Sequence, residues 1–169
     1  SWQMLQLYDR LFPSGWVSRM GEPDVWQKIY DVDPGELWET HYALKNLLLQ
    51  FVRRRVTRQC NRRGESNESI ESAREVLDPN VLTIGFARRF ATYKRAALFL
   101  TQLDRLHELV CDKNRPIQII FAGKAHPADE PGKALIQKIA NLRHDSQMAG
   151  RIVFVEDYDI NVCRHLIQG

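Results

Sequence analysis

The chain has 169 residues, is 44% hydrophobic and carries a formal net charge of +3, so it can bury one ordinary core and is not a disordered sequence. No run approaches the 18 apolar residues of a membrane span, and Ser1-Trp-Gln-Met lacks the profile of a secretory signal. Its basic residues form two local clusters, which argues against a dedicated nucleic-acid binder. We therefore expect a cytoplasmic protein that contacts neither membrane nor nucleic acid.

The cysteine content points the same way. Cys60, Cys111 and Cys163 are far apart, odd in number and lack the Cys-x-x-Cys or histidine spacing of a zinc site. We expect reduced thiols and no bound metal.

The first third of the chain has helical periodicity. Residues 2–12 place apolar side chains on one stripe, and a second short helix is predicted over 23–30. Asp33-Pro34-Gly35-Glu36 combines a cap, a proline at the first helical position and a glutamate three residues after the cap, so a long helix should run from there to about Arg58. Residues 1–63 are thus predicted to be a helical segment.

Six arginines occur between Arg53 and Arg63. They could form a stripe that binds nucleic acid. They could also complement the carbonyl end of a helix, with Gly64 as its cap, and we favour this second interpretation. Residues 64–79 are polar and rich in Glu and Ser, and are predicted to be a mobile connector.

From residue 80 onward, apolar runs alternate with helical patterns. The apolar run at 81–86 is typical of a parallel strand covered on both faces, 117–121 is a second continuous apolar run, and residues 151–155 give a third strand. Helices are predicted after each run, starting at Tyr93 with Thr92 as N-cap, at Pro131 and after Asp159; the last two sites also follow the capping rules. The fold class is therefore α/β, with residues 80–169 forming a parallel, doubly wound, Rossmann-like βαβαβα unit.

Basic residues follow the first predicted strand. Arg88, Arg89 and Lys94 lie where that strand passes into the predicted helix. Free backbone N–H groups and the helix dipole favour an anion at such a start, and arginine and lysine are the side chains that bind phosphate. The alternative is a solvated basic helix end with no ligand.

The other two strands also end in polar residues. Lys124 and His126 follow the second strand, and Glu156 and Tyr158 follow the third. Because ligands of parallel sheets bind at the carboxyl ends of the strands, all of these side chains could line one crevice.

Two other motifs carry little weight. Gly123-Lys124 lacks the earlier glycine of a phosphate loop, and Ala125 stands where Ser or Thr would hold magnesium. His126, Asp129 and Glu130 could bind a metal, but the flanking prolines favour a plain loop.

Three strings nevertheless resemble a known family. TIGFARRFATYKRA at 83–96, FAGKAHP at 121–127 and VFVEDYDINV at 153–162 are similar to the carboxy-terminal domain of the α-glucan (glycogen or maltodextrin) phosphorylases, most of all to the shorter bacterial and archaeal branch. The resemblance implies that Arg89 and Lys94 contact the substrate phosphate. It also implies a pyridoxal phosphate cofactor.

The same resemblance assigns further residues. It places Arg88, Lys94 and Tyr158 near the cofactor phosphate, and Tyr93 and Lys124 at the substrate site. Asp159 stands where the animal enzymes have an arginine beside that phosphate. The lysine that carries the cofactor belongs to a glycine-rich motif that this chain does not contain.

The implied function is that of a glycosyltransferase with two Rossmann domains, the GT-B fold. Such an enzyme catalyses phosphorolysis of α-1,4-glucan (glycogen, starch or maltodextrin) to glucose 1-phosphate. Its partners would be the α-glucan, inorganic phosphate, the remaining domains and a second copy in a homo-oligomer. This chain alone is expected to be inactive.

Two alternatives remain open. The first is a domain of a nucleotide-sugar-dependent glycogen or starch synthase, which shares the fold and a similar phosphate grip. The second is a non-enzymatic basic module centred on residues 53–63.

Overall fold

The computed structural model describes residues 1–169. In chain order the elements are α1 (Trp2–Leu11), η1 (Trp16–Arg19), α2 (Pro23–Trp26), η2 (Gln27–Asp31), α3 (Pro34–Arg62), α4 (Asn67–Glu75), β1 (Leu82–Ala87), η3 (Thr92–Lys94), η4 (Ala96–Leu100), α5 (Leu103–Cys111), β2 (Ile117–Ala122), α6 (Glu130–Asn141), η5 (Leu142–His144), β3 (Ile152–Val155) and α7 (Ile160–Gln168). They form two compact units, residues 1–48 with 168–169 and residues 49–167. No helix is both long and apolar enough to cross a membrane.

The first unit is organised around aromatic side chains. Phe12, Trp16 and Val25 are buried together, and the ring of Tyr8 stacks on that of Phe12 with centroids 5.0 Å apart. The Trp16 indole N–H donates to Asp9 Oδ1 at 2.8 Å, so its one polar group is satisfied. The helix predicted over 2–12 is confirmed as α1, and its apolar stripe packs this core.

Helix α3 begins and ends on local signals. The Asp33 carboxylate accepts the N–H of Glu36 at 3.0 Å, as the predicted cap requires. The helix continues to Arg62 rather than stopping near Arg58. Gly64 follows with φ +65, and the N–H groups of Gly64 and Glu65 return to carbonyls of the last turn, both at 3.1 Å. This is a Schellman ending, and it confirms Gly64 as the cap.

Part of the predicted connector over 64–79 is helical. Nine of its residues form α4, whose first turn is capped by Ser66 Oγ, which accepts the N–H of Ser69 at 3.2 Å. Ala73 on this helix is buried. The Ser66 cap and one apolar face suffice to build a helix from a largely polar sequence.

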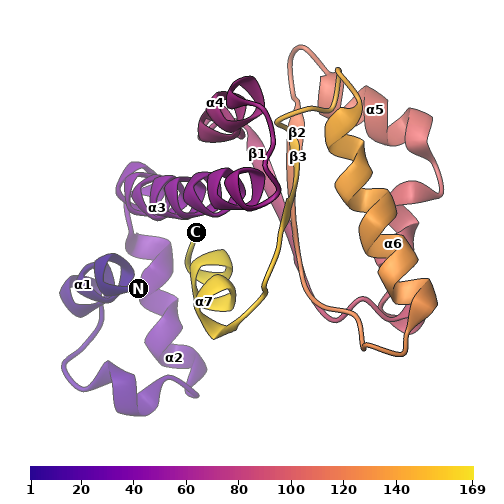
Figure 1. The fold of residues 1–169 in the computed structure, drawn as a ribbon. Coiled ribbons are helices and arrows are strands. Elements are labelled where there is room, and N and C mark those ends of the chain that lie inside the picture. Colours follow the sequence, from indigo (N-terminus) through magenta and orange to yellow (C-terminus); the bar gives the residue numbers. More distant parts are fainter. The chain divides into compact units, whose positions relative to one another are not determined.

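The sheet has three parallel strands in the order β1-β2-β3, which confirms the α/β class. Ile119 of β2 pairs with Ile84 on one side and with Ile152 on the other. Strand β2 is buried from Gln118 onward, and the Gln118 amide is satisfied by the backbone of Asp78. Helices α5 and α6 lie on one side of the sheet, and α4, α7 and the second half of α3 lie on the other (Figure 1).

Strand β1 departs from the expectation of a strand covered on both faces. None of its six residues is fully buried, and Leu82 is 65% exposed. The apolar run at 81–86 thus identified the strand correctly but not its burial. Burial depends on the elements that pack on each face, which the run itself does not encode.

The helix expected from Tyr93 also takes a different form. Two short 3-10 turns, η3 and η4, replace it, and Arg95 between them has φ +61. The residue before η3 is Ala91, so Thr92 is not an N-cap, and regular α-helix begins only at Leu103. The left-handed backbone at Arg95 breaks a pattern of apolar residues that by spacing alone would have continued as one helix.

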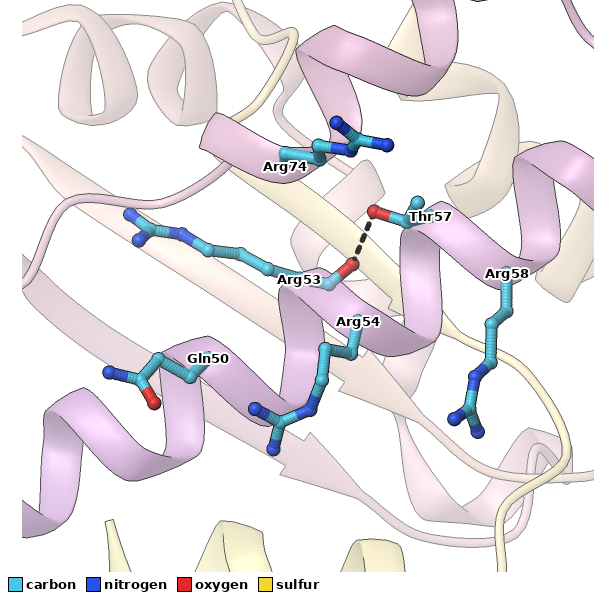
Figure 2. Close-up of a pocket in the computed structure, with 6 residues that line it drawn as sticks. All are labelled: Gln50, Arg53, Arg54, Thr57, Arg58 and Arg74. Atoms are coloured by element: carbon cyan, nitrogen blue, oxygen red, sulfur yellow. Dashed lines mark hydrogen bonds between the residues drawn. The ribbon is translucent and has the colours of Figure 1, made fainter.

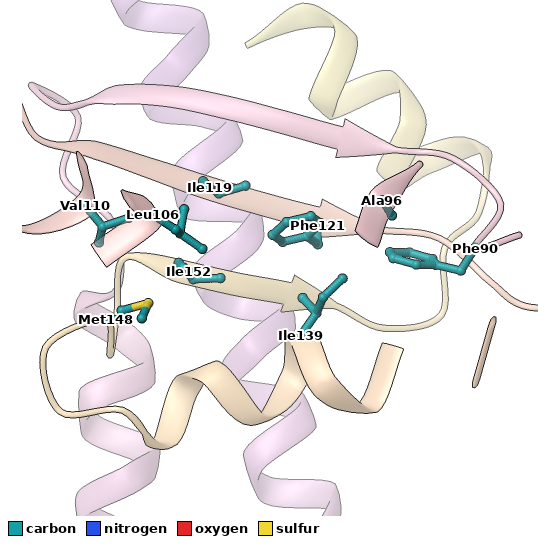
Figure 3. Close-up of a cluster of buried hydrophobic side chains, with 9 residues drawn as sticks. All are labelled: Phe90, Ala96, Leu106, Val110, Ile119, Phe121, Ile139, Met148 and Ile152. Atoms are coloured by element: carbon teal, nitrogen blue, oxygen red, sulfur yellow. The ribbon is translucent and has the colours of Figure 1, made fainter. Parts of the chain in front are cut away.

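One hydrophobic cluster fills the space between the sheet and helices α5 and α6. Its buried members are Phe90, Ala96, Leu106, Val110, Ile119, Phe121, Ile139, Met148 and Ile152. Figure 3 shows Phe90 at one end of this cluster and Val110 at the other. The end that contains Phe90 lies at the carboxyl ends of the strands (Figure 3).

Candidate functional site

Loops that leave the carboxyl ends of β1 and β2 meet at one edge of the sheet. The N–H of Arg88 donates to the carbonyl of Ala122 at 3.2 Å, and the N–H of Phe90 donates to the carbonyl of Lys124 at 3.0 Å. The parallel pairing of the strands therefore continues into the loops. Arg88, Arg89 and Lys124 are brought together by these backbone bonds.

The basic side chains at this edge form no ion pairs. Arg88, Arg89, Lys94 and Lys124 are all free of such contacts, whereas Arg55, Arg62 and Arg63 each bind a carboxylate. Lys124 is nevertheless close enough to Asp157 to contribute to the lowering of its pKa. The Lys94 ammonium lies 4.7 Å from the centre of the Tyr93 ring, and Tyr93 is 70% exposed. The edge thus presents uncompensated positive charge beside an exposed aromatic ring.

The electrostatics differ from the sequence expectation in one respect. The expected helix start beside Lys94 is only the three-residue turn η3. Such a short turn lacks the aligned peptide dipoles that make a helix N-terminus favourable for anions. An anion bound at this edge would be held by the arginine and lysine side chains themselves.

The acidic residues after β3 are already paired. Glu156 forms ion pairs with Arg62 and Arg63, and Asp157 pairs with Arg62 at 2.7 Å. Hydrogen bonding from Arg62 is the main reason why the pKa of Asp157 lies below its ordinary value. Asp159 pairs with Arg55 at 3.1 Å and also accepts the N–H of Val162 at the start of α7. The third strand end is therefore electrically neutralised, while the first two keep their positive charge.

These ion pairs also bear on the interpretation of the arginines of residues 53–63 as partners of their own helix end. Arg53 donates to two backbone carbonyls, and Arg55 and Arg62 bind carboxylates of other elements, so these arginines act across the fold rather than on the end of their own helix. Arg54 and Arg58 stay exposed and line a hollow of about 580 Å³ with Arg74. In Figure 2 the guanidinium groups around this hollow point in different directions, so they do not converge on one ligand position.

The remaining predicted site residues lie close to the strand ends but have local partners. Tyr158 is half-buried, and a hydrogen bond with Cys163 raises its pKa. His126 Nδ1 accepts the N–H of Ala128 at 3.1 Å, and Asp129 caps α6. His126 and Asp129 thus shape the loop between β2 and α6.

Two residues at this edge were missed by sequence reasoning. Phe90, directly after the two arginines, is fully buried, and Gly132 lies buried in the first turn of α6. A single apolar residue after a basic pair was the available signal for Phe90. Nothing local marks Gly132, because its neighbour is Phe90, 42 positions earlier in the chain.

No family model matches the chain. It is 43% identical over 167 residues to a glycogen phosphorylase of Mycobacterium tuberculosis, and the match covers 99% of this chain and 19% of that protein. A glycogen phosphorylase of Aquifex aeolicus is 39% identical, with 97% of this chain and 24% of that protein covered. A maltodextrin phosphorylase of Thermococcus litoralis is 36% identical, with 99% and 20% covered. The chain thus spans 19–24% of the length of these curated relatives.

Proposed function

We propose that this chain, which matches a segment of glycogen and maltodextrin phosphorylases over nearly its whole length, is part of an α-glucan phosphorylase. The likeness confirms the resemblance drawn from the three sequence strings. The complete protein would cleave α-1,4-glucan with inorganic phosphate and release glucose 1-phosphate. It would have the GT-B fold, work in the cytoplasm and form a homo-oligomer.

One observation of the structure carries the role of this chain: the segments that follow β1 and β2 contain four cations that form no ion pair. In the proposed site Arg89 and Lys94 hold the substrate phosphate. A planar guanidinium can bind two phosphate oxygens at once, and the lysine adds a compact charge. Tyr93 and Lys124 would border the sugar.

The same residues fit a cofactor phosphate. Pyridoxal phosphate would supply its phosphate group as an acid and base partner for the substrate phosphate. Arg88 and Lys94 would hold that group, with Tyr158 beside it. Asp159 would not oppose it strongly, because its carboxylate is bound by Arg55 and by the N–H of Val162. The lysine that carries the cofactor would come from another part of the complete protein.

Substitution of Arg89 and Lys94 in the complete protein tests this assignment. A charge-assisted hydrogen bond contributes about 1.5–3 kcal/mol, so Arg89→Ala or Lys94→Ala should lower kcat/KM for phosphate roughly ten- to a hundredfold. Arg89→Lys should be nearly as harmful, because lysine cannot reproduce the planar fork. The measurement is release of glucose 1-phosphate from maltodextrin at varied phosphate concentration.

Arg95→Gln is the control. Arg95 is exposed, has no ion pair and lies in the same stretch of chain, so its loss should have little effect. Equal losses at Arg95 and Arg89 would indicate a diffuse basic surface and would contradict the proposed site. Activity that requires a nucleotide sugar instead of phosphate would favour the synthase alternative.

A further inference from the structure

We propose that Phe90, Gly123 and Gly132 are positioning residues that fix the turn at Arg88 and Arg89 in its phosphate-binding geometry. The inference rests on the proposed function, because it names what orients that same site. None of the three residues would touch phosphate. Each acts on the backbone that carries the two arginines.

Phe90 is the anchor of this turn. It is 0% exposed, and its ring lies 5.6 Å from that of Phe86 and 5.7 Å from that of Phe154, centroid to centroid. Arg88 and Arg89 immediately before it are exposed. A buried ring next to two solvated cations limits how far their backbone can move.

Gly123 lets the loop after β2 approach this turn closely. A Cβ atom added at Gly123 would overlap the carbonyl oxygen of Arg88 and would lie 2.8 Å from Cε2 of Phe90. The two backbone hydrogen bonds that join the loops lie on either side of this contact, at Arg88 and at Phe90. Any side chain at position 123 would force the loops apart.

Gly132 closes the arrangement from the side of α6. A Cβ atom there would overlap the carbonyl oxygen of Phe90 and would lie 2.8 Å from Oδ2 of Asp129. The N–H of Gly132 donates to Oδ1 of Asp129 at 2.9 Å, which holds the first turn of the helix in place. The first turn of α6 therefore packs directly against the peptide group that follows Phe90. This peptide group lies between Arg89 and Lys94 in the chain.

This arrangement has a clear use in a phosphate site. Four unpaired cations repel one another, and their long side chains lose conformational entropy when they bind an ion. A rigid backbone beneath them reduces that loss and holds them at the required spacing. Gly85 on β1 provides the contrast, because a Cβ atom there would meet only Leu166 Cδ2, at an ordinary 3.9 Å.

The test is Gly132→Ala in the complete protein, with KM for phosphate, KM for glucan and Tm measured. The added methyl must displace the Phe90 carbonyl and with it the backbone of the two arginines. A weakened charge-assisted hydrogen bond to phosphate should then raise KM for phosphate about tenfold or more. KM for glucan should stay unchanged. Gly85→Ala is the matched glycine control and should change neither constant.

A second control distinguishes a loss of stability from a loss of phosphate binding. Val110→Ala removes buried methyl groups from the same hydrophobic cluster at the end away from Phe90 (Figure 3), so it should lower Tm and leave KM for phosphate unchanged. If Gly132→Ala does not yield folded protein, Phe90→Leu takes its place, because it loosens the anchor without adding bulk.

A double-mutant cycle tests whether Gly132 affects phosphate binding through Arg89. In an Arg89→Ala background, Gly132→Ala should cause little further rise in KM for phosphate, because the group that it positions is gone. A fully additive rise, or a change in Tm without a change in KM, would overturn the positioning role and leave the proposed function intact. An Arg89→Ala protein with unchanged KM for phosphate would instead overturn the proposed function, and the positioning role with it.

Discussion

The backbone around Leu77 depends on one arginine from a distant helix. Leu77 is buried and has φ +65, a conformation that a leucine adopts only when its surroundings enforce it. Arg53 Nε donates to the carbonyl of Val76 at 2.9 Å, and a terminal nitrogen of Arg53 donates to the carbonyl of Leu77 at 2.6 Å. The Leu77 N–H donates to the carbonyl of Gly150 at 2.8 Å. The turn between α4 and β1 is thus bound on both sides.

Replacement of Arg53 by Gln should therefore destabilise the fold. Two hydrogen bonds from a charged group are lost, each with a contribution of about 1.5–3 kcal/mol. Because water can reach part of this site and satisfy one carbonyl, we expect the free energy of unfolding to fall by about 3 kcal/mol. Arg54→Gln, one position along the same helix and exposed, should change it by no more than about 0.5 kcal/mol.

Urea unfolding of the 169-residue chain measures both values. Hydrogen exchange of the Leu77 amide gives a local measurement, and its protection should decrease in Arg53→Gln but not in Arg54→Gln. Equal stability of the two variants, with Leu77 still protected, would show that the left-handed turn holds without Arg53. The reasoning would then be refuted.

Two further predictions concern the end of α3 and its ion pairs. Gly64→Ala should lower the free energy of unfolding by about 1 kcal/mol, because alanine resists the left-handed φ of +65, whereas Gly21→Ala, with open space around it, should not; urea unfolding compares them. Arg62 lowers the pKa of Asp157 in the folded state. The ionised carboxylate therefore stabilises the fold at pH values above its ordinary pKa, and this stabilisation is lost as the pH falls through the lowered pKa of the folded state. Arg62→Gln should weaken this acid-dependent loss, and Tm measured between about pH 5 and pH 2 should show it; an unchanged pH dependence would contradict the pairing.

Local sequence patterns determined most of the element order. Three apolar runs without alternation identified the parallel strands, because strands in such sheets are built from continuous apolar stretches. The start of α3 followed from the Asp33 side chain, which caps its first turn, and Gly64 was identified as the cap of its other end, although the predicted end near Arg58 fell short of Arg62. Basic residues at the ends of β1 and β2 were also found from sequence, because strand ends of a parallel sheet meet at one edge.

Contacts between distant residues decided the rest. The pattern after Tyr93 is helical by spacing, yet the backbone at Arg95 turns left-handed and divides it into two short turns. The arginines of residues 53–63 look alike in sequence and differ only in which carbonyl or carboxylate the fold brings to each. Gly132 becomes important only because the fold places it against Phe90. Periodicity reports which face of an element is apolar, whereas partners far apart in sequence are set only when the chain has closed around its core.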